Sequence, residues 1–243
     1  MTPLAPDNQH ALRRQAWAFG RDLRDRLVDD YRREYGIAIP PPPAFIMDEL
    51  LTDFLDVTLR FDPLRLDRFA QTEWLDGRVV VTINSLTHEI PGVKDPQGVQ
   101  NVAKGHEAVH VVRDIKALQA EQGNRFPGFD VPLKIVCYRA RRPGSDFDRR
   151  EFWAEEAGRA AVVSHRALGR SAAFQALMKL EPGSMRANGE AWRLLYKASR
   201  DIGVNSRALV TQLRLEGLID VSKEDGRNVL RVQPSLFDWV TAP

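Results

Sequence analysis

The feature that most constrains this 243-residue chain is the stretch Val102-Ala-Lys-Gly-His-Glu-Ala-Val-His110, which contains a His-Glu-x-x-His motif. On an α-helix, residues four apart lie on one face, about 6 Å apart along the axis. His106 and His110 can therefore converge on one zinc ion, and Glu107 can polarise a water molecule beside it. A fold that uses this motif must bring a third protein ligand to the same face of the helix.

Apolar residues surround the motif and predict a largely buried helix. They are Val102, Ala103, Ala108, Val109, Val111 and Val112. Buried histidines need partners, and a metal ion can serve both. The alternative is a solvated helix with two incidental histidines. The motif arises by chance in about one random sequence of this composition in two hundred, and the apolar setting favours the metal site.

The composition limits both the partner and the kind of metal site. A formal net charge of +2 is too small to indicate a nucleic-acid partner by itself. Cys137 is the single cysteine, which excludes an intramolecular disulfide and a cysteine-based zinc site. No apolar run of ~18 residues predicts a transmembrane helix, and the N-terminal sequence does not resemble a signal peptide. We therefore expect a cytoplasmic location and no membrane partner.

Residues 1–44 are expected to form an N-terminal helix and a stiff connector. The helix should run from His10 to about Tyr35, because apolar residues recur at steps of three and four. Gly36 should end it, and the four prolines at 40–43 forbid further helix.

Residues 45–187 are expected to form an α+β core around the motif. The pattern predicts a helix running into a strand over 45–59, strands at 78–84 and 131–138, and helices at 97–119, 149–168 and 171–180. The pair Asp76-Gly77 predicts a turn before the strand at 78–84.

The helix at 149–168 is expected to supply the third metal ligand. It carries three carboxylates near its start, Glu151, Glu155 and Glu156. Glu151 and Glu155 share a helix face, whereas Glu156 turns aside. Periodicity does not choose among the three.

Residues 188–243 have the outline of a winged helix, which is a helix-turn-helix followed by a hairpin. Helices are expected at 190–200 and 207–216, and strands at 218–221 and 228–232. Gly203 lies in the turn between the helices, Asn205 is a plausible N-cap, and Asp225-Gly226 is the hairpin turn.

The winged-helix-like segment offers two interpretations. DNA could bind Arg207, Gln212 and Arg214 on the second helix, and Arg227 on the hairpin. Alternatively, the segment recognises protein or packs on the core, which the interspersed acidic residues mildly favour. These are Asp201, Glu216, Asp220, Glu224 and Asp225.

Over roughly residues 45–220 the chain resembles the ImmA/IrrE family of zinc metallopeptidases. That family pairs a His-Glu-x-x-His helix with a later helix of pattern Glu-x-x-Ala-Asn-x-Phe-Ala-x-x-Leu-Leu-Met-Pro. Its members often end in a segment like Phe-Gly-Val-Ser-x-x-Ala-Leu-x-x-Arg-Leu-x-x-Leu-Gly-Leu-Ile. The stretch Ile202-Gly-Val-Asn-Ser-Arg-Ala-Leu-Val-Thr-Gln-Leu-Arg-Leu-Glu-Gly-Leu-Ile219 follows it closely. The resemblance implies a mostly helical, zincin-like metallopeptidase core with a small sheet, followed by a C-terminal winged-helix-like segment.

The resemblance also implies a ligand set of His106, His110 and Glu151, because Glu151-Phe-Trp-Ala154 falls on Glu-x-x-Ala. Glu155 stands where the family has Asn and is the reserve ligand. Ala157 replaces the aromatic residue of the pattern, and Ser164 replaces its proline.

The implied function is that of a zinc-dependent endopeptidase with Glu107 as its catalytic base. Its implied substrate is one helix-turn-helix transcriptional repressor, whose cleavage derepresses stress-response or mobile-element genes. Tyr138, His88 and His165 are weak candidates for the donor that stabilises the oxyanion. The alternative is a non-catalytic antirepressor, or a DNA- or protein-binding regulator that acts through the winged helix. The oligomeric state does not follow from the sequence.

Overall fold

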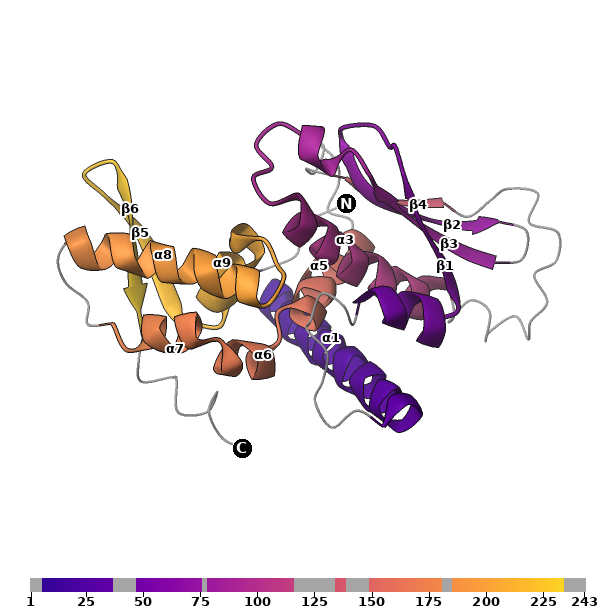
Figure 1. Cartoon of the computed structure of the whole chain (residues 1–243), viewed down its shortest axis with the longest axis horizontal. Coiled ribbons are helices and arrows are strands. Elements are labelled where there is room, and N and C mark those ends of the chain that lie inside the picture. Colours follow the sequence, from indigo (N-terminus) through magenta and orange to yellow (C-terminus); the bar gives the residue numbers. More distant parts are fainter. Residues whose placement is uncertain are drawn as a thin grey trace. The chain divides into compact units, whose positions relative to one another are not determined.

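The computed structural model describes residues 6–36, 47–75, 78–115, 134–138, 149–180 and 185–233. The predicted α+β class is confirmed, because helices predominate and two small sheets accompany them (Figure 1). The chain divides into two compact units, Met1–Val162 and Val163–Pro243. None of the described helices combines the length and the apolarity needed to cross a membrane.

The sheet of the N-terminal unit has four strands in the order β1-β3-β2-β4. These are β1 (Val57–Asp62), β2 (Arg68–Leu75), β3 (Arg78–Asn84) and β4 (Lys134–Tyr138). Strand β1 is parallel to β3, and β2 is antiparallel to both β3 and β4. The central strand β3 has the predicted bounds and is buried from Val79 onward. Strand β2 was not predicted from the sequence.

Asn84 is the last residue of β3, and its side chain hydrogen-bonds to backbone groups of the segments around that end of the sheet. Its side-chain oxygen accepts from the backbone N–H groups of Leu64 and Leu86, each at 3.0 Å. Its amide nitrogen donates to the carbonyl of Arg68 at 2.8 Å. The side chain is fully buried, so these bonds satisfy polar groups that water does not reach. A short 3₁₀ helix, η2 (Thr87–Glu89), follows.

The motif helix is α3 (Pro96–His110). Asp95 caps it by accepting from the N–H of Gly98 at 2.9 Å, and Pro96 occupies its first turn. The predicted helix continued to 119. Instead, the chain changes to a π-helical turn, η3 (Val111–Ile115), directly after His110, and residues 116–119 lie outside the described ranges. Another π-helical turn, η1 (Leu50–Phe54), precedes β1, where the sequence predicted a helix running into a strand.

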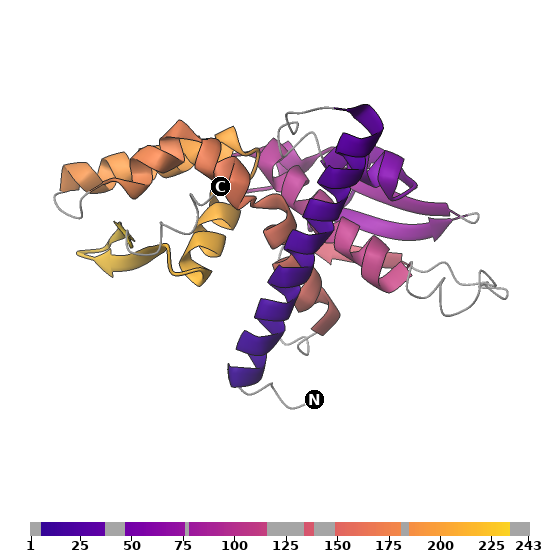
Figure 2. The same ribbon diagram turned by 90° about the horizontal axis from the view of Figure 1, so that it is seen from below.

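Three helices pack in series beside the sheet, with α5 (Arg149–Val162) between α1 (Pro6–Tyr35) and α3 (Figure 2). Helix α1 confirms the predicted N-terminal helix and ends at Gly36, whose φ is 61°. The backbones of α1 and α5 approach closely at Gly20, where a Cβ atom would lie 2.1 Å from the carbonyl oxygen of Ala157. Ala157, which stands where the ImmA/IrrE pattern has an aromatic residue, is fully buried.

Buried polar groups also join α1 to α5. Arg24 donates to the carbonyl of Ala161 at 2.7 Å, near the C-terminal end of α5, and burial lowers the pKa of Arg24 to about 10 despite the opposing charge of Asp25. Glu156 accepts from the indole N–H of Trp17 at 2.9 Å and pairs with Arg159 at 2.5 Å. These contacts make α1 part of the same unit as α5.

The two-unit division differs from the predicted boundaries at 44 and 187. The N-terminal helix belongs to the first unit because it packs on α5. The predicted helix over 149–168 stops at Val162, since Ser164 caps a new helix, α6 (His165–Arg170), by accepting from the N–H of Ala167. Helix α7 (Ala172–Met178) then packs on α8 (Met185–Asp201) in the second unit. The proline connector at 40–43 lies outside the described residues.

The C-terminal unit contains the predicted succession of elements. Helix α8 is followed by a tight turn, α9 (Ser206–Leu215), β5 (Ile219–Glu224) and β6 (Arg227–Val232). Gly203 has a φ of 68°, and Asn205 caps α9 by accepting from the N–H of Ala208 at 2.8 Å. Asp225 and Gly226 both have positive φ, as a two-residue hairpin turn requires.

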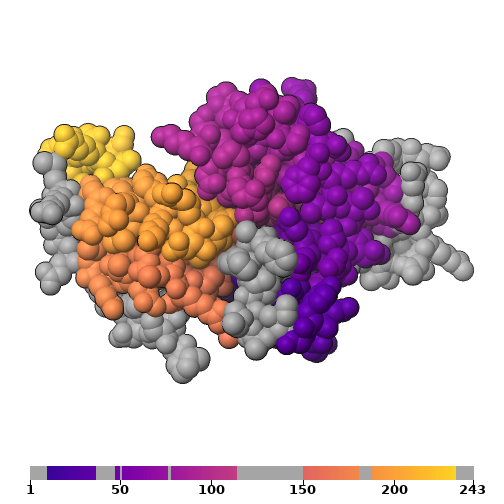
Figure 3. All heavy atoms as spheres, viewed as in Figure 1, coloured from indigo at the N-terminus to yellow at the C-terminus, as the bar shows by residue number. Residues whose placement is uncertain are grey.

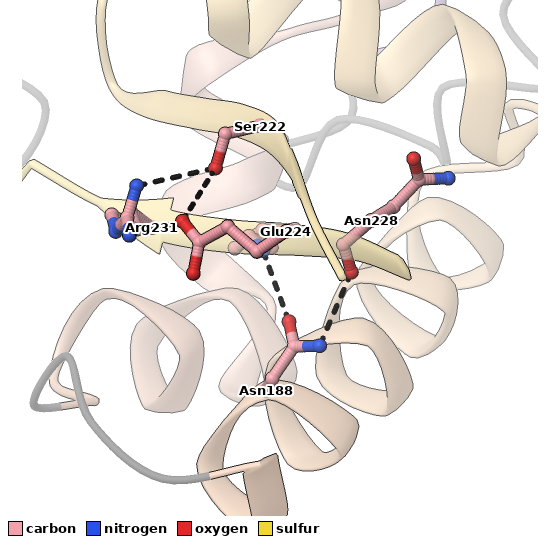
Figure 4. A network of polar contacts seen from close by, with 6 residues as sticks. Asn188, Ser222, Glu224, Asn228 and Arg231 are labelled. Carbon is pink, nitrogen blue, oxygen red and sulfur yellow. Dashed lines mark hydrogen bonds and ion pairs between the residues drawn. The ribbon is translucent and has the colours of Figure 1, made fainter. Parts of the chain in front are cut away.

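Side chains of α8 hold strand β6 (Figure 4). Asn188 donates to the carbonyl of Asn228 at 3.2 Å and accepts from the N–H of Leu230 at 3.0 Å. The indole of Trp192 donates to the same carbonyl at 3.2 Å. Within the hairpin, Arg231 donates to Ser222 at 3.2 Å and pairs with Glu224. The amide of Asn188 thus bonds to β6 as the backbone of a neighbouring strand would.

Candidate metal centre

Helices α3 and α5 bring two imidazoles and one carboxylate together. The Nε2 atoms of His106 and His110 lie 3.0 Å apart, one turn of α3 from each other. Glu151, in the first turn of α5, places Oε2 3.4 Å from Nε2 of His106 and Oε1 3.3 Å from Nε2 of His110. The predicted first-choice carboxylate therefore lies beside both motif histidines.

The spacing of these three side chains suits a metal ion. A tetrahedral ion with ligand bonds of about 2.1 Å needs donor atoms about 3.4 Å apart, and the separations here are 3.0, 3.3 and 3.4 Å. The three residues also form a group whose ligand atoms lie within 4.8 Å of one another. Both histidines are buried, whereas the Glu151 side chain is 38% exposed. The group can therefore hold a metal ion, with Glu151 on its open side.

The electrostatics of the group favour an ionised Glu151. Partial burial of this carboxyl opposes ionisation, but hydrogen bonds and charge from His106 and His110 outweigh it, so the pKa of Glu151 lies well below its usual range. An anionic carboxylate is the form that binds a metal.

Glu107 is fully buried beside the two histidines. Its Oε2 accepts from the hydroxyl of Thr72 at 2.5 Å, whereas its Oε1 has no hydrogen-bond partner among the described residues. Burial raises the pKa of Glu107, although the charges of His106 and His110 and the Thr72 hydrogen bond oppose that shift. One carboxylate oxygen is thus held in place, and the other remains able to bind a water molecule or a proton.

Two glycines allow the helices to meet closely enough to form the group. A Cβ atom at Gly158 would lie 2.6 Å from Cα of His106, and one at Gly105 would lie 2.3 Å from a methyl group of Val162. Real Cβ atoms do not approach other atoms so closely, so both positions need glycine. This contact sets the distance between the α3 histidines and Glu151.

The other two carboxylates of α5 point elsewhere. Glu155, the predicted reserve ligand, is exposed, lies 3.8 Å from Arg159 and does not belong to the group. Its side chain projects one helical turn beyond Glu151, toward solvent. Glu156 is buried on the side of α5 that faces α1.

Of the predicted oxyanion donors, His88 and His165 do not join the group. His88 is exposed in η2, 3.6 Å from Glu89. His165 belongs to the C-terminal unit, where its Nε2 lies 2.8 Å from the carboxylate of Glu216. Tyr138 ends β4, but its side chain lies outside the described part of the structure.

Sequence reasoning missed Thr72 and Lys104. Thr72 lies on the unpredicted strand β2. The signal that could have found this strand is the run of β-forming residues before Asp76-Gly77, because it pairs antiparallel with the run that follows. The ammonium of Lys104 is buried on α3 and lies 2.5 Å from Asp48, which ties the motif helix to the segment before η1. A lysine in an apolar helix gives no sequence signal of such a partner.

In the C-terminal unit, Arg207, Arg214 and Arg227 are exposed, as DNA or partner binding would require. Gln212 is not. It is 1% exposed and donates to Glu216 at 2.7 Å. It lies on the buried face of α9, together with Ala208 and Leu209, and not on the exposed face that carries Arg207 and Arg214.

No protein-family model matches this chain, and no curated protein or solved structure shows significant similarity to it.

Proposed function

We propose that the protein is a zinc-dependent endopeptidase related in mechanism to the ImmA/IrrE family. His106, His110 and Glu151 would hold the zinc, and Glu107 would act as the general base. One observation carries this proposal. Three donor atoms lie at the spacing that a tetrahedral metal requires, and beside them is a buried carboxylate with one oxygen uncommitted.

The chain's own residues account for the proton transfers. When bound, zinc would supply Lewis acidity, which makes a water molecule and a peptide carbonyl more reactive. Glu107 takes the proton from the attacking water on Oε1, while Thr72 holds Oε2. Glu107 then gives that proton to the leaving amine. Burial raises the pKa of Glu107, which suits a carboxylate that must hold a proton between these two steps.

The proposed fold and substrate go together. The sheet with α3 and α5 would be a zincin-like core, and α8 to β6 would be a winged helix. The resemblance of the chain to ImmA/IrrE proteins supports one specific helix-turn-helix repressor as the substrate, whose cleavage would release stress-response or mobile-element genes. A buried glutamate with one uncommitted oxygen beside the three donor atoms supports hydrolysis over simple binding.

Co-expression with the helix-turn-helix regulator encoded beside this chain tests the proposal. The wild-type chain should generate a discrete regulator fragment and retain about one zinc ion per chain. Glu107→Gln should keep the zinc and yield no fragment. Cleavage by Glu107→Gln at the wild-type rate would show that another group is the base.

A matched pair of variants on α5 tests the ligand set. Glu151→Gln should lose zinc and cleavage, whereas Glu155→Gln removes an equal charge one turn away and should retain both. If the wild-type chain binds zinc and relieves repression without cutting the regulator, the protein is an antirepressor and the endopeptidase proposal fails.

A further inference from the structure

The solvent-exposed faces of α8 and α9 carry a set of cations that the peptidase proposal does not use. We propose that the C-terminal unit binds duplex DNA, with α9 in the major groove and α8 against the phosphate backbone. This inference is independent of the metal centre, because its residues all belong to the second unit.

Helix α8 has one apolar and one basic face. Its buried face consists of Ala191, Leu194, Leu195 and Ala198. Its exposed face carries Lys197 and Arg200, with Tyr196 46% exposed beside them, and Arg193, which pairs with the exposed Glu190 at 3.2 Å. Residues three and four apart on a helix share a face, about 5–6 Å apart along the axis. In the space-filling view of Figure 3, α8 forms an open surface of its unit.

Helix α9 presents a second exposed basic face. Arg207 lies in its first turn and Arg214 in its last, with the half-buried Thr211 between them. In a helix-turn-helix, the N-terminal half of the second helix reads base edges in the major groove, while the first helix crosses the backbone. Arginine and threonine are side chains that can contact base edges. The hairpin after α9 exposes Lys223 near its turn, as a wing would.

Charge pairing inside the unit favours DNA over a protein partner. Three of the acidic residues that would repel DNA are engaged with other residues, whereas Asp220 and Asp225 are exposed. Asp201 accepts from Ser171 at 2.6 Å, Glu216 is buried against His165, and Glu224 pairs with Arg231. In contrast, Lys197, Arg200, Arg207 and Arg214 have no ion pair with any residue that the structure describes.

The overall charge agrees with this arrangement. Residues 163–243 contain twelve Lys and Arg against eight Asp and Glu, whereas residues 1–162 contain 23 against 25. The net positive charge of the chain therefore comes from the C-terminal unit, because the first unit has a small net negative charge. A basic excess with unpaired cations on two adjacent helices of a helix-turn-helix order is the electrostatic footprint of a DNA-binding unit.

Fluorescence anisotropy with the full chain tests the inference. The probes are a labelled mixed-sequence duplex of about 30 base pairs and polyglutamate of similar charge, measured between about 50 and 200 mM salt. We expect salt-dependent binding to the duplex. Each lost phosphate contact should lower the slope of log affinity against log salt by about one, so Lys197→Ala with Arg200→Ala should lower it by about two.

Arg207→Ala with Arg214→Ala should weaken duplex binding about tenfold or more. The control removes two exposed cations from α1, Arg26→Ala with Arg33→Ala, which changes the net charge equally and should leave duplex binding unchanged. Three results would overturn the inference: no salt-sensitive duplex binding, equal losses in the control and the test variants, or polyglutamate binding as tight as duplex binding. Tight polyglutamate binding would indicate that the basic face of α8 and α9 binds an acidic protein.

Discussion

The two units use charged side chains in opposite ways. In the first unit, His106, His110 and Glu107 are buried, the two Nε2 atoms lie 3.0 Å apart, and Oε2 of Glu107 accepts from Thr72. In the second unit, Arg207 and Arg214 are exposed and lack ion pairs within the described residues. A metal centre needs donor atoms placed to within tenths of an ångström. A surface that meets phosphates needs only charge on long, adaptable side chains.

The difference predicts where the chain tolerates change. The first unit should respond to the loss of the proposed metal or of a hydroxyl, and to the addition of a methyl group. The second should respond mainly to changes in charge. Four experiments test this contrast, in order of decreasing expected effect.

Removing the metal should affect the first unit alone. A ligand present at 1,000 times its dissociation constant stabilises the folded state by about 4 kcal/mol. Chelation of the proposed metal should therefore lower the free energy of unfolding by that amount. Hydrogen exchange resolved by peptide is the measurement, and protection should fall in α3 and α5 but not in α8 and α9. An equal fall in both units would remove the contrast.

Gly158→Ala should be strongly destabilising, because it adds a methyl group at the contact between α3 and α5. The new Cβ would lie 2.6 Å from Cα of His106, so the helices must separate, at a cost of about 3 kcal/mol. Urea unfolding should show this loss, and zinc affinity should fall with it. Wild-type stability together with wild-type zinc affinity would mean that the α3–α5 contact does not set the metal site.

Thr72→Val should cost about 2 kcal/mol, because it leaves a buried carboxylate oxygen without its donor. The Thr72 hydrogen bond lowers the pKa of Glu107, so its loss should raise that pKa further. Thr72→Ser should restore both stability and cleavage, since it keeps the hydroxyl. If Thr72→Ser behaves as Thr72→Val does, the methyl group of Thr72 matters and the hydrogen bond does not.

Gly189→Ala in α8 is the counterpart of Gly158→Ala and should have the smallest effect. Nothing lies within 4 Å of the added Cβ atom. Alanine should therefore stabilise the helix by about 0.5–1 kcal/mol, because glycine loses more backbone freedom on folding. Chemical denaturation measures the gain, and destabilisation instead would show that this face of α8 is covered.

Local patterns in the sequence predicted the elements that local forces determine. The bounds of β3, the Asn205 cap and the turn at Gly203 followed from β-branched runs, capping chemistry and glycine. The motif helix was predicted for the same reason. Each of these depends on residues within a few positions of one another.

Long-range contacts explain what the sequence did not predict. Thr72 meets Glu107 only because β2 pairs between β3 and β4, a register that no local pattern encodes. The burial of Gln212 depends on where Glu216 and the core of its unit lie. The choice of Glu151 over Glu155 required the resemblance, because both share one face of α5. In the structure only Glu151 lies beside both histidines, and Glu155 lies near Arg159.

The bond between Asn188 and strand β6 has a consequence for self-association. An exposed strand edge is a template on which a second chain can add its own strand, and proteins protect such edges. The carbonyl of Asn228 and the N–H of Leu230 are already occupied by a side-chain amide. Asn188 thereby keeps two backbone groups of the hairpin from pairing with a neighbouring molecule in a crowded solution.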